Sequence, residues 1–195
     1  MKKKTQTRGP FTLLASREVY KNPWVRVRED KVIRPDGTRG IFGVTTAHPG
    51  VSIVAIDKKG FCYLIKEYGY AIGRPTTKLM AGAVDKGETS LQAAKRECLE
   101  ESGMGGGVWH YLGTIHYYPT IFDTQEHMYL SLDIEKRQEQ SEEERALIQV
   151  VQVPFQKAVH MALAGNIDGA ESVVAILKAD YYLRSKKHTV VSKKV

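Results

Sequence analysis

The sequence predicts an α+β fold in which helices pack on a mostly antiparallel or mixed sheet. Three observations predict it: apolar runs of strand length, turn residues between them, and an order of strands, one helix, strands and two helices. At 195 residues the chain is long enough for one domain with a hydrophobic core. Its 42% hydrophobic and 26% charged residues are typical of a soluble globular protein.

The first predicted strands form two hairpins. Residues 24–46 contain two strands that turn at Pro35-Asp36-Gly37, a sequence that favours turns. Two more strands flank a turn at residues 58–60. The strands predicted after the first hairpin are 51–57, 61–68, 111–118, 127–135 and 146–154.

Helices are predicted at residues 89–102, 154–165 and 170–185. In the first of them, Leu91, Ala94 and Cys98 have the spacing of a face that packs on the core. Gly103 then provides a helix stop. The acidic run at 142–145 is predicted to be an exposed loop.

The charge distribution argues against a specific nucleic-acid partner. The formal net charge is +7, but nine cations lie in the first ten and last twelve residues, which leaves −2 for the rest. We expect a disordered basic tail at residues 1–15 and a second basic tail at 184–195. No aromatic residues are interleaved with these charges, so only weak, salt-sensitive attraction to polyanions is expected.

A membrane or secreted location is not predicted. No apolar run approaches the ~20 residues of a membrane span, and the apolar patch near the start is too short for a signal peptide. The two cysteines, Cys62 and Cys98, provide neither a disulfide framework nor the spacing of a zinc site. We therefore expect a cytoplasmic protein.

The helix at 89–102 carries closely spaced carboxylates. Glu97 and Glu101 are four residues apart with Glu100 between them, so all three lie on one side of the helix. Arg96 precedes Glu100 by four residues and can hold its carboxylate. Carboxylates at this range repel one another unless cations neutralise them, and ligands that are all oxygen favour Mg²⁺ or Mn²⁺. The spacing indicates metal-assisted displacement at phosphate; the alternative is a solvated helix stabilised by ion pairs.

A longer motif surrounds this helix. Gly82 is followed after five residues by Glu88, and after seven more by the run Arg96-Glu97-Cys98-Leu99-Glu100-Glu101-Ser102-Gly103-Met104. This segment, residues 82–104, is identified as a Nudix box, G-x5-E-x7-R-E-U-x-E-E-x-G-U, with apolar Cys98 and Met104 at the U positions. From ordinary residue frequencies, its identities arise together by chance at on the order of 10⁻⁹ per starting point, which rejects the solvated helix.

The similarity extends over roughly residues 17–183 and resembles the ADP-ribose pyrophosphatase branch of the Nudix family. It implies a Nudix α/β/α sandwich with a mixed sheet over residues 16–183, including an N-terminal strand appendage at 16–48. Family members have "LPAG" or a similar sequence before the box, and here it is Leu79-Met80-Ala81-Gly82. A proline sixteen residues beyond the last box glycine marks this branch, and Pro119 matches it.

The resemblance also implies roles for the box residues. The metal ligands fall on the backbone carbonyl of Ala81, on Glu97 and on Glu101, with Glu100 beside them. Arg96 is expected to orient the glutamates. Glu88 is expected to support the metal shell. These residues, with Gly82 and Gly103, make up the expected catalytic centre.

Substrate binding is implied in the same way. In the family, two aromatic residues stack on adenine across a dimer, and the matching positions are Trp24 and Phe42. Pro119 is the third expected substrate-binding position. The expected partners are therefore a small nucleoside diphosphate derivative and a second copy of this chain.

Two departures from the family pattern concern the phosphates and the general base. The family often has an arginine in "QYR", whereas this chain has "EYG" with Gly69, so Arg74 is the candidate replacement. The family's loop glutamate, a candidate general base, aligns with Ala146. Glu143 or Glu144 could reach instead, with Glu144 our choice, or a box glutamate could take the role.

The expected activity is metal-dependent hydrolysis of a nucleoside diphosphate linked to another moiety. ADP-ribose, cleaved to AMP and ribose 5-phosphate, is the first choice of substrate. One alternative is a pyrophosphatase of GDP- or UDP-sugars. The other is a Nudix domain that senses a nucleotide without hydrolysing it, which Gly69 and Ala146 leave open.

Overall fold

The computed structural model describes residues 6–191, except for the side chains of Glu143 and residues 187–191. The chain divides into two units. The N-terminal unit consists of Met1–Pro49 with His116–Gln125, and the main unit consists of Gly50–Ile115 with Glu126–Val195. Residues 1–5 and 192–195 of the two expected tails lie outside the described residues.

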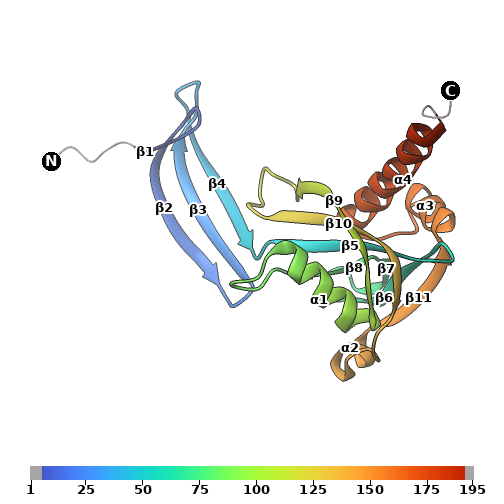
Figure 1. Ribbon diagram of the computed structural model, residues 1–195. Coiled ribbons are helices and arrows are strands. Elements are labelled where there is room, and N and C mark those ends of the chain that lie inside the picture. The colour runs from blue at the N-terminus through green and yellow to red at the C-terminus, as the bar shows by residue number, and fades with distance from the viewer. Residues whose placement is uncertain (1–5, 192–195) are drawn as a thin grey trace. The chain divides into compact units, whose positions relative to one another are not determined.

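The N-terminal unit is built on a four-stranded antiparallel sheet in the order β1-β2-β3-β4 (Figure 1). Its strands are β1 (Gln6–Arg8), β2 (Phe11–Lys21), β3 (Val25–Ile33) and β4 (Arg39–Ala47). The hairpin predicted at residues 24–46 is confirmed, and Gly37 takes a left-handed φ of 84° in its turn. The segment 116–125 joins β4, where the Thr45 N–H donates to the Ile121 carbonyl at 2.8 Å.

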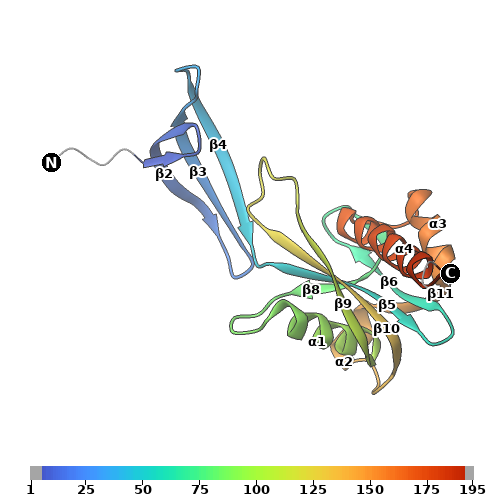
Figure 2. The same ribbon diagram turned by 45° about the horizontal axis from the view of Figure 1, so that its top comes forward.

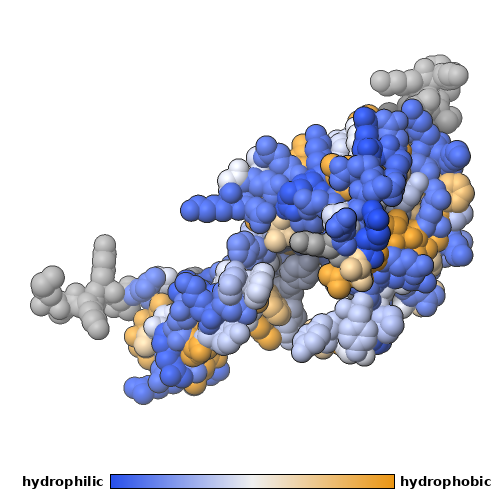
Figure 3. Space-filling view, turned by 90° about the horizontal axis from the view of Figure 1, so that it is seen from below, coloured by the Kyte–Doolittle hydropathy of each residue, from blue (hydrophilic) through white to orange (hydrophobic). Residues whose placement is uncertain are grey.

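Several large apolar side chains of this sheet are exposed, and Figure 3 shows orange surface interspersed with blue on the unit. They are Leu14, Val19, Tyr20, Trp24 and Ile41. A sheet of this size usually needs a second layer on its apolar side chains. The unit therefore carries surface suited to a partner.

The expected disordered tail is wrong for residues 6–15. Strand β1 pairs with the start of β2, with Gln6 opposite Leu13, around Gly9 at a φ of 58°. Strand β2 in turn pairs with β3, so the backbone of residues 11–21 has hydrogen-bonding partners in the strand that follows it in the chain. The basic composition of the tail carried no sign of this pairing.

The main unit contains a mixed seven-stranded sheet and four helices. Its strands are β5 (Gly50–Asp57), β6 (Phe61–Gly69), β7 (Arg74–Lys78), β8 (Met80–Ala83), β9 (Met104–His116), β10 (Gln125–Lys136) and β11 (Gln149–Pro154). Its helices are α1 (Ser90–Ser102), α2 (Glu142–Leu147), α3 (Phe155–Leu163) and α4 (Ala170–Val191). The sheet order is β11-β6-β5-β10-β9, with β7 beside β6 and β8 beside β5. Since β10 runs parallel to β5 while β6 and β8 run antiparallel to it, the mixed sheet is confirmed.

Helices cover both faces of this sheet (Figure 2). On β5, Val51 and Ile53 pack in a core with α1, whereas Val54 and Ile56 pack in a second core with α3 and α4. Successive residues of a strand point to opposite faces, so one buried strand serves both cores. The α/β/α sandwich is thereby confirmed. Among residues 6–191, no helix is both long enough and apolar enough to span a membrane.

The segment at 142–147 differs from the prediction. It forms α2 instead of an exposed loop and the start of a strand, and β11 begins only at Gln149. Ser141 caps the helix by accepting a hydrogen bond from the Glu144 N–H. Glutamates in the first turn and Arg145 in the last also suit the helix dipole. At the other end of the chain, α4 continues past the expected boundary at residue 183 to Val191.

Helix α1 has well-defined ends. Thr89 caps its start through a capping box with Gln92. Gly103 ends it in the left-handed conformation, with φ at 69°, and its N–H donates to the Leu99 carbonyl at 2.8 Å. A Cβ atom on Gly103 would also overlap the backbone carbonyl oxygen of Gln138.

We predict that Gly103→Ala lowers the free energy of unfolding by more than the ~1 kcal/mol typical of a residue forced into the left-handed region. The extra cost arises because the Gln138 backbone must move. Gly60→Ala is the matched control, since Gly60 has φ at 83° and open space around its Cβ position. Urea denaturation of both variants measures the difference, and equal losses would contradict the steric argument.

Candidate active site

The box residues come together from two elements of the main unit. Strand β8 carries Ala81 and Gly82, helix α1 carries Arg96, Glu97, Glu100 and Glu101, and Glu88 lies in the turn between them. A Cβ atom at Gly82 would overlap the carboxylate of Glu97. Glycine is therefore required here so that the helix carboxylate can lie against the strand backbone.

Arg96 holds three of the glutamates. Its Nε and Nη2 donate to the two carboxylate oxygens of Glu88, each at 3.0 Å. Its Nη1 donates to Glu97 at 2.7 Å and to Glu100 at 3.0 Å. Its Nη2 also donates to the Ala83 carbonyl at 2.9 Å, so all five N–H groups of the guanidinium have acceptors in the protein. The two-point pair raises the pKa of Arg96 and lowers the pKa of Glu88.

Glu101 lies outside the clamp that Arg96 forms with Glu88, Glu97 and Glu100. It is 5% exposed, and the Ala81 N–H donates to its Oε2 at 3.0 Å. The pKa of Glu101 is raised to about 8, chiefly by burial; Lys78 and the Ala81 N–H act to lower it, and the charges of Glu97 and Glu144 act to raise it. The site thus has a buried carboxyl group whose charged form is disfavoured.

Glu97 is a second carboxyl group of the site whose pKa is raised. Burial raises its pKa, and although Arg96 opposes this, the charges of Glu100 and Glu144 add to the increase. Glu97, Glu101 and Glu144 therefore lie within electrostatic range of one another. Such a group is stabilised by a cation placed among its oxygens.

The donor set suits Mg²⁺ or Mn²⁺, but the carboxylates are not already arranged as a metal cage. Among the side chains described between residues 6 and 191, no three acidic, histidine or cysteine groups are placed to hold one ion. Glu97 and Glu100 instead accept hydrogen bonds from Arg96. The residues therefore fit Mg²⁺ or Mn²⁺ by ligand type, because they supply oxygen atoms that repel one another, but the carboxylates are not arranged around one position.

Glu144, predicted as a replacement base, lies on α2 within range of both Glu97 and Glu101. Ser141 ties this helix to α1, because its N–H donates to the Glu100 carbonyl at 3.1 Å. Ala146, which aligns with the family's loop glutamate, is exposed on the same helix. The side chain of Glu143 lies outside the described part of the chain.

Arg74, predicted to replace the family's phosphate-binding arginine, faces Gly69 across the β6–β7 pair. Its guanidinium is already engaged, since Nη2 contacts Asp168 at 2.5 Å and Nη1 donates to the Pro75 carbonyl at 3.1 Å. This ion pair lowers the pKa of Asp168. Arg74 therefore ties β7 to the segment before α4.

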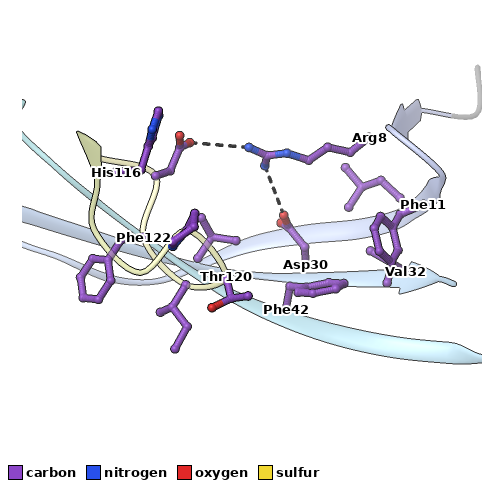
Figure 4. A pocket seen from close by; sticks show the side chains of 13 residues that line it. Arg8, Phe11, Asp30, Val32, Phe42, His116, Thr120 and Phe122 are labelled. Carbon is purple, nitrogen blue, oxygen red and sulfur yellow. Dashed lines mark ion pairs between the residues drawn. The ribbon is translucent and has the colours of Figure 1, made fainter. Parts of the chain in front are cut away.

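Two of the four predicted substrate-binding residues come together in the N-terminal unit. Phe42 and Pro119 line a cavity of about 490 Å³ (Figure 4). Phe11 packs edge-on against Phe42, with ring centroids 5.2 Å apart. At the rim, Arg8 lies 3.9 Å from Asp30 and 3.6 Å from Asp123. The sequence analysis missed Arg8 and Phe11, because both fell within the supposed tail.

Trp24 does not join this cavity. It is 72% exposed and precedes Val25, which pairs with Ala47, whereas Phe42 pairs with Asp30. Trp24 is thus six residues along the strand from the rung of Phe42, about 20 Å at ~3.3 Å per residue. The two aromatic rings of one chain cannot stack on the same base.

Lys78 is a further cation that the sequence analysis did not name. It ends β7, and its Nζ lies 2.8 Å from the carboxylate of Glu67. The only signal in the sequence is a lone lysine directly before the "LMAG" segment that enters the box. Only the register of the β6–β7 pair shows that Lys78 lies on the face of the sheet that packs against α1.

Comparisons with known proteins agree with this geometry. Residues 46–174 match the NUDIX domain family, and residues 11–45 match the nucleoside diphosphate sugar hydrolase N-terminal domain. An ADP-ribose pyrophosphatase of Mycobacterium tuberculosis is 26% identical over 169 residues, covering 86% of this chain and 82% of that protein. A putative Nudix hydrolase 2 of Caenorhabditis elegans is 32% identical over 114 residues, covering 53% of this chain and 51% of the relative.

A crystal structure of an ADP compounds hydrolase has the same fold, with a TM-score of 0.78 at 21% sequence identity. It covers 94% of this chain and 98% of the other. The NUDIX match spans well over half of the chain and includes the whole box from Gly82 to Met104. The box glutamates, their arginine and the strand glycine meet at one place in the structure. The chain therefore belongs to the Nudix hydrolase family.

Proposed function

We propose that this Nudix hydrolase cleaves the diphosphate of a nucleoside diphosphate derivative with the help of Mg²⁺ or Mn²⁺. Our preferred substrate is ADP-ribose, which would yield AMP and ribose 5-phosphate. The observation that carries the proposal is the geometry of the box: Arg96 holds Glu88, Glu97 and Glu100 together, and the Ala81 N–H donates to the buried Glu101. A dianionic diphosphate can approach such a cluster only together with metal ions.

The residues that would hold the metal are Glu97, Glu100, Glu101 and the carbonyl of Ala81. When bound, such an ion polarises a phosphoryl oxygen and lowers the pKa of an attacking water. Arg96 keeps the carboxylates in reach by holding Glu97 and Glu100 on one side of α1. Glu88 fixes the guanidinium in turn through its two-point pair.

We assign the role of general base to Glu144. It faces the metal-binding glutamates from a separate helix, and α2 is fixed to α1 by the hydrogen bond between Ser141 and Glu100. A general base must lie within hydrogen-bond reach of the water molecule that it deprotonates.

Recognition of the base is assigned to Phe42 and Pro119 of the N-terminal cavity and to Trp24. Because Trp24 and Phe42 of one chain are about 20 Å apart along the strands, both can contact one base only if two copies contribute. The exposed apolar side chains of the N-terminal sheet support a homodimer on the same grounds. Two free, buried cysteines suit a cytoplasmic enzyme.

A second candidate function is hydrolysis of a nucleoside diphosphate sugar. The family name matched by residues 11–45 favours it, while the named relatives act on ADP-ribose or ADP compounds. Stacking on aromatic rings discriminates weakly between bases, so the cavity around Phe42 is compatible with either substrate.

The central test is turnover of a panel containing ADP-ribose, ADP-glucose, GDP-mannose and UDP-glucose with and without Mg²⁺. We expect hydrolysis only with the metal, and we expect Glu101→Gln to slow it by about three decades, through loss of ~4 kcal/mol of transition-state stabilisation. Thermal denaturation checks that the variant is folded. A folded Glu101→Gln protein with wild-type turnover would refute the metal assignment.

The assignment of the base is tested by comparing two variants of α2. Glu144→Gln should lower kcat by ~10²–10⁴ with Mn²⁺ affinity little changed, because a general base contributes about that much. Glu142→Gln, on the same helix but exposed, should retain wild-type kcat. If both variants behave alike, a box glutamate is the base.

Trp24→Ala tests the contribution of the exposed ring to binding. Stacking contributes ~1–3 kcal/mol, so KM should rise roughly tenfold or more with little change in kcat. Because Trp24 is largely exposed, the melting temperature should not fall. An unchanged KM would place the base elsewhere. AMP should also quench the fluorescence of Trp24, with Trp109→Phe as the control for background.

A further inference from the structure

Lys78 lies on the same face of the sheet as the catalytic helix. It stands opposite Ile65 in the β6–β7 pair, and Ile65 belongs to the core that packs against α1. Directly opposite residues of an antiparallel pair point to the same side of the sheet. Its positive charge lowers the pKa of Glu101, which places the ammonium within electrostatic reach of that carboxylate.

The ammonium group of Lys78 is held in place by one ion pair and has N–H donors beyond that contact. The side chain is 24% exposed and its Nζ contacts Glu67 at 2.8 Å. An ammonium group has three N–H donors, and the described residues provide Glu67 as its ion-pair partner. Glu67 stands on the same face as Ile65, two residues along β6, so it fixes the direction of the lysine.

The two arginines of this region already have partners in the protein. Every N–H group of Arg96 donates to a glutamate or to the Ala83 carbonyl. Arg74 is bound to Asp168 and to the Pro75 carbonyl. Arg96 therefore cannot bind an anionic substrate without giving up contacts within the protein, whereas Arg74 is held by its ion pair with Asp168.

The position where related proteins carry an arginine is closed in this chain. A Cβ atom on Gly69 would lie 2.8 Å from Thr76 Cγ2 and 3.0 Å from Ile72 Cγ1. Thr76 is buried and bonded to the Glu67 carbonyl, so it cannot move aside easily. A longer side chain at position 69 would therefore require Thr76 or Ile72 to move.

We propose that Lys78 binds a non-bridging oxygen of the substrate's diphosphate, and that Glu67 positions it. This inference rests on the proposed function, because it names the phosphate ligand of the same site. An ammonium with donors to spare and a fixed direction can bind a phosphate oxygen as the metal-bound diphosphate enters. The interaction forms in the bound substrate and persists in the transition state.

The test measures steady-state kinetics with ADP-ribose and Mg²⁺ in four variants. Lys78→Gln should raise KM by about tenfold or more, with a much smaller change in kcat, because a charged hydrogen bond is lost from ground and transition states alike. Lys78→Arg should recover most of the affinity. Glu67→Gln should raise KM by less than Lys78→Gln. Lys66→Gln is the matched control, since Lys66 is exposed one rung away on the opposite face.

A binding experiment separates failure of this inference from failure of the proposed function. Calorimetry with α,β-methylene-ADP, a diphosphate that the enzyme cannot cleave at that bond, should show about tenfold weaker binding to Lys78→Gln than to wild type. If wild type hydrolyses nothing in the panel but this loss is found, Lys78 remains a diphosphate ligand. If turnover is normal and Lys78→Gln keeps wild-type KM and affinity, the lysine is a structural partner of Glu67. If wild type does not bind the analogue, both proposals fail.

Discussion

Repulsion between carboxylates is the constraint on which the main unit's architecture depends. Helix α1 brings Glu97, Glu100 and Glu101 to one side, and α2 adds Glu144 to them. Arg96 neutralises only part of this charge, since Glu101 lies beyond its reach. Strand β8 approaches Glu97 at a position without a side chain, Gly82, and the Ala81 N–H beside it donates to Glu101.

The surrounding elements hold this arrangement in place. The capping box at Thr89 and the left-handed Gly103 fix the length of α1, so its glutamates keep their register. Strand β5 supports the helix with alternate residues, while its other residues anchor α3 and α4. Lys78 and Glu67 extend the charged surface along β7 and β6. The catalytic chemistry thus depends on backbone pairing far from the box.

Much of this was predictable because the signals are local. The box spacing identified the helix, its stop and its clamp, and alternating apolar runs identified most strands. What failed carries a weaker local signal. Strand β1 and the start of β2 lie in a segment interpreted as a basic tail, although each pairs with the strand that follows it in the chain, and α2 forms where Ser141 supplies a cap. Arg74 and Lys78 could be told apart only from Asp168 and the strand register.

The buried side of α1 has a consequence for how the enzyme tolerates change. Ala93, Ala94 and Cys98, all fully buried, are small, so the helix axis lies close to the sheet. A single added methyl group there would shift the whole row of glutamates outward relative to Ala81. Catalysis would then decline through a change of sub-ångström size while the fold survived. These small side chains therefore set the distance between α1 and the sheet. Substitutions at these positions are limited by side-chain volume, although the positions lie on the buried side of the helix.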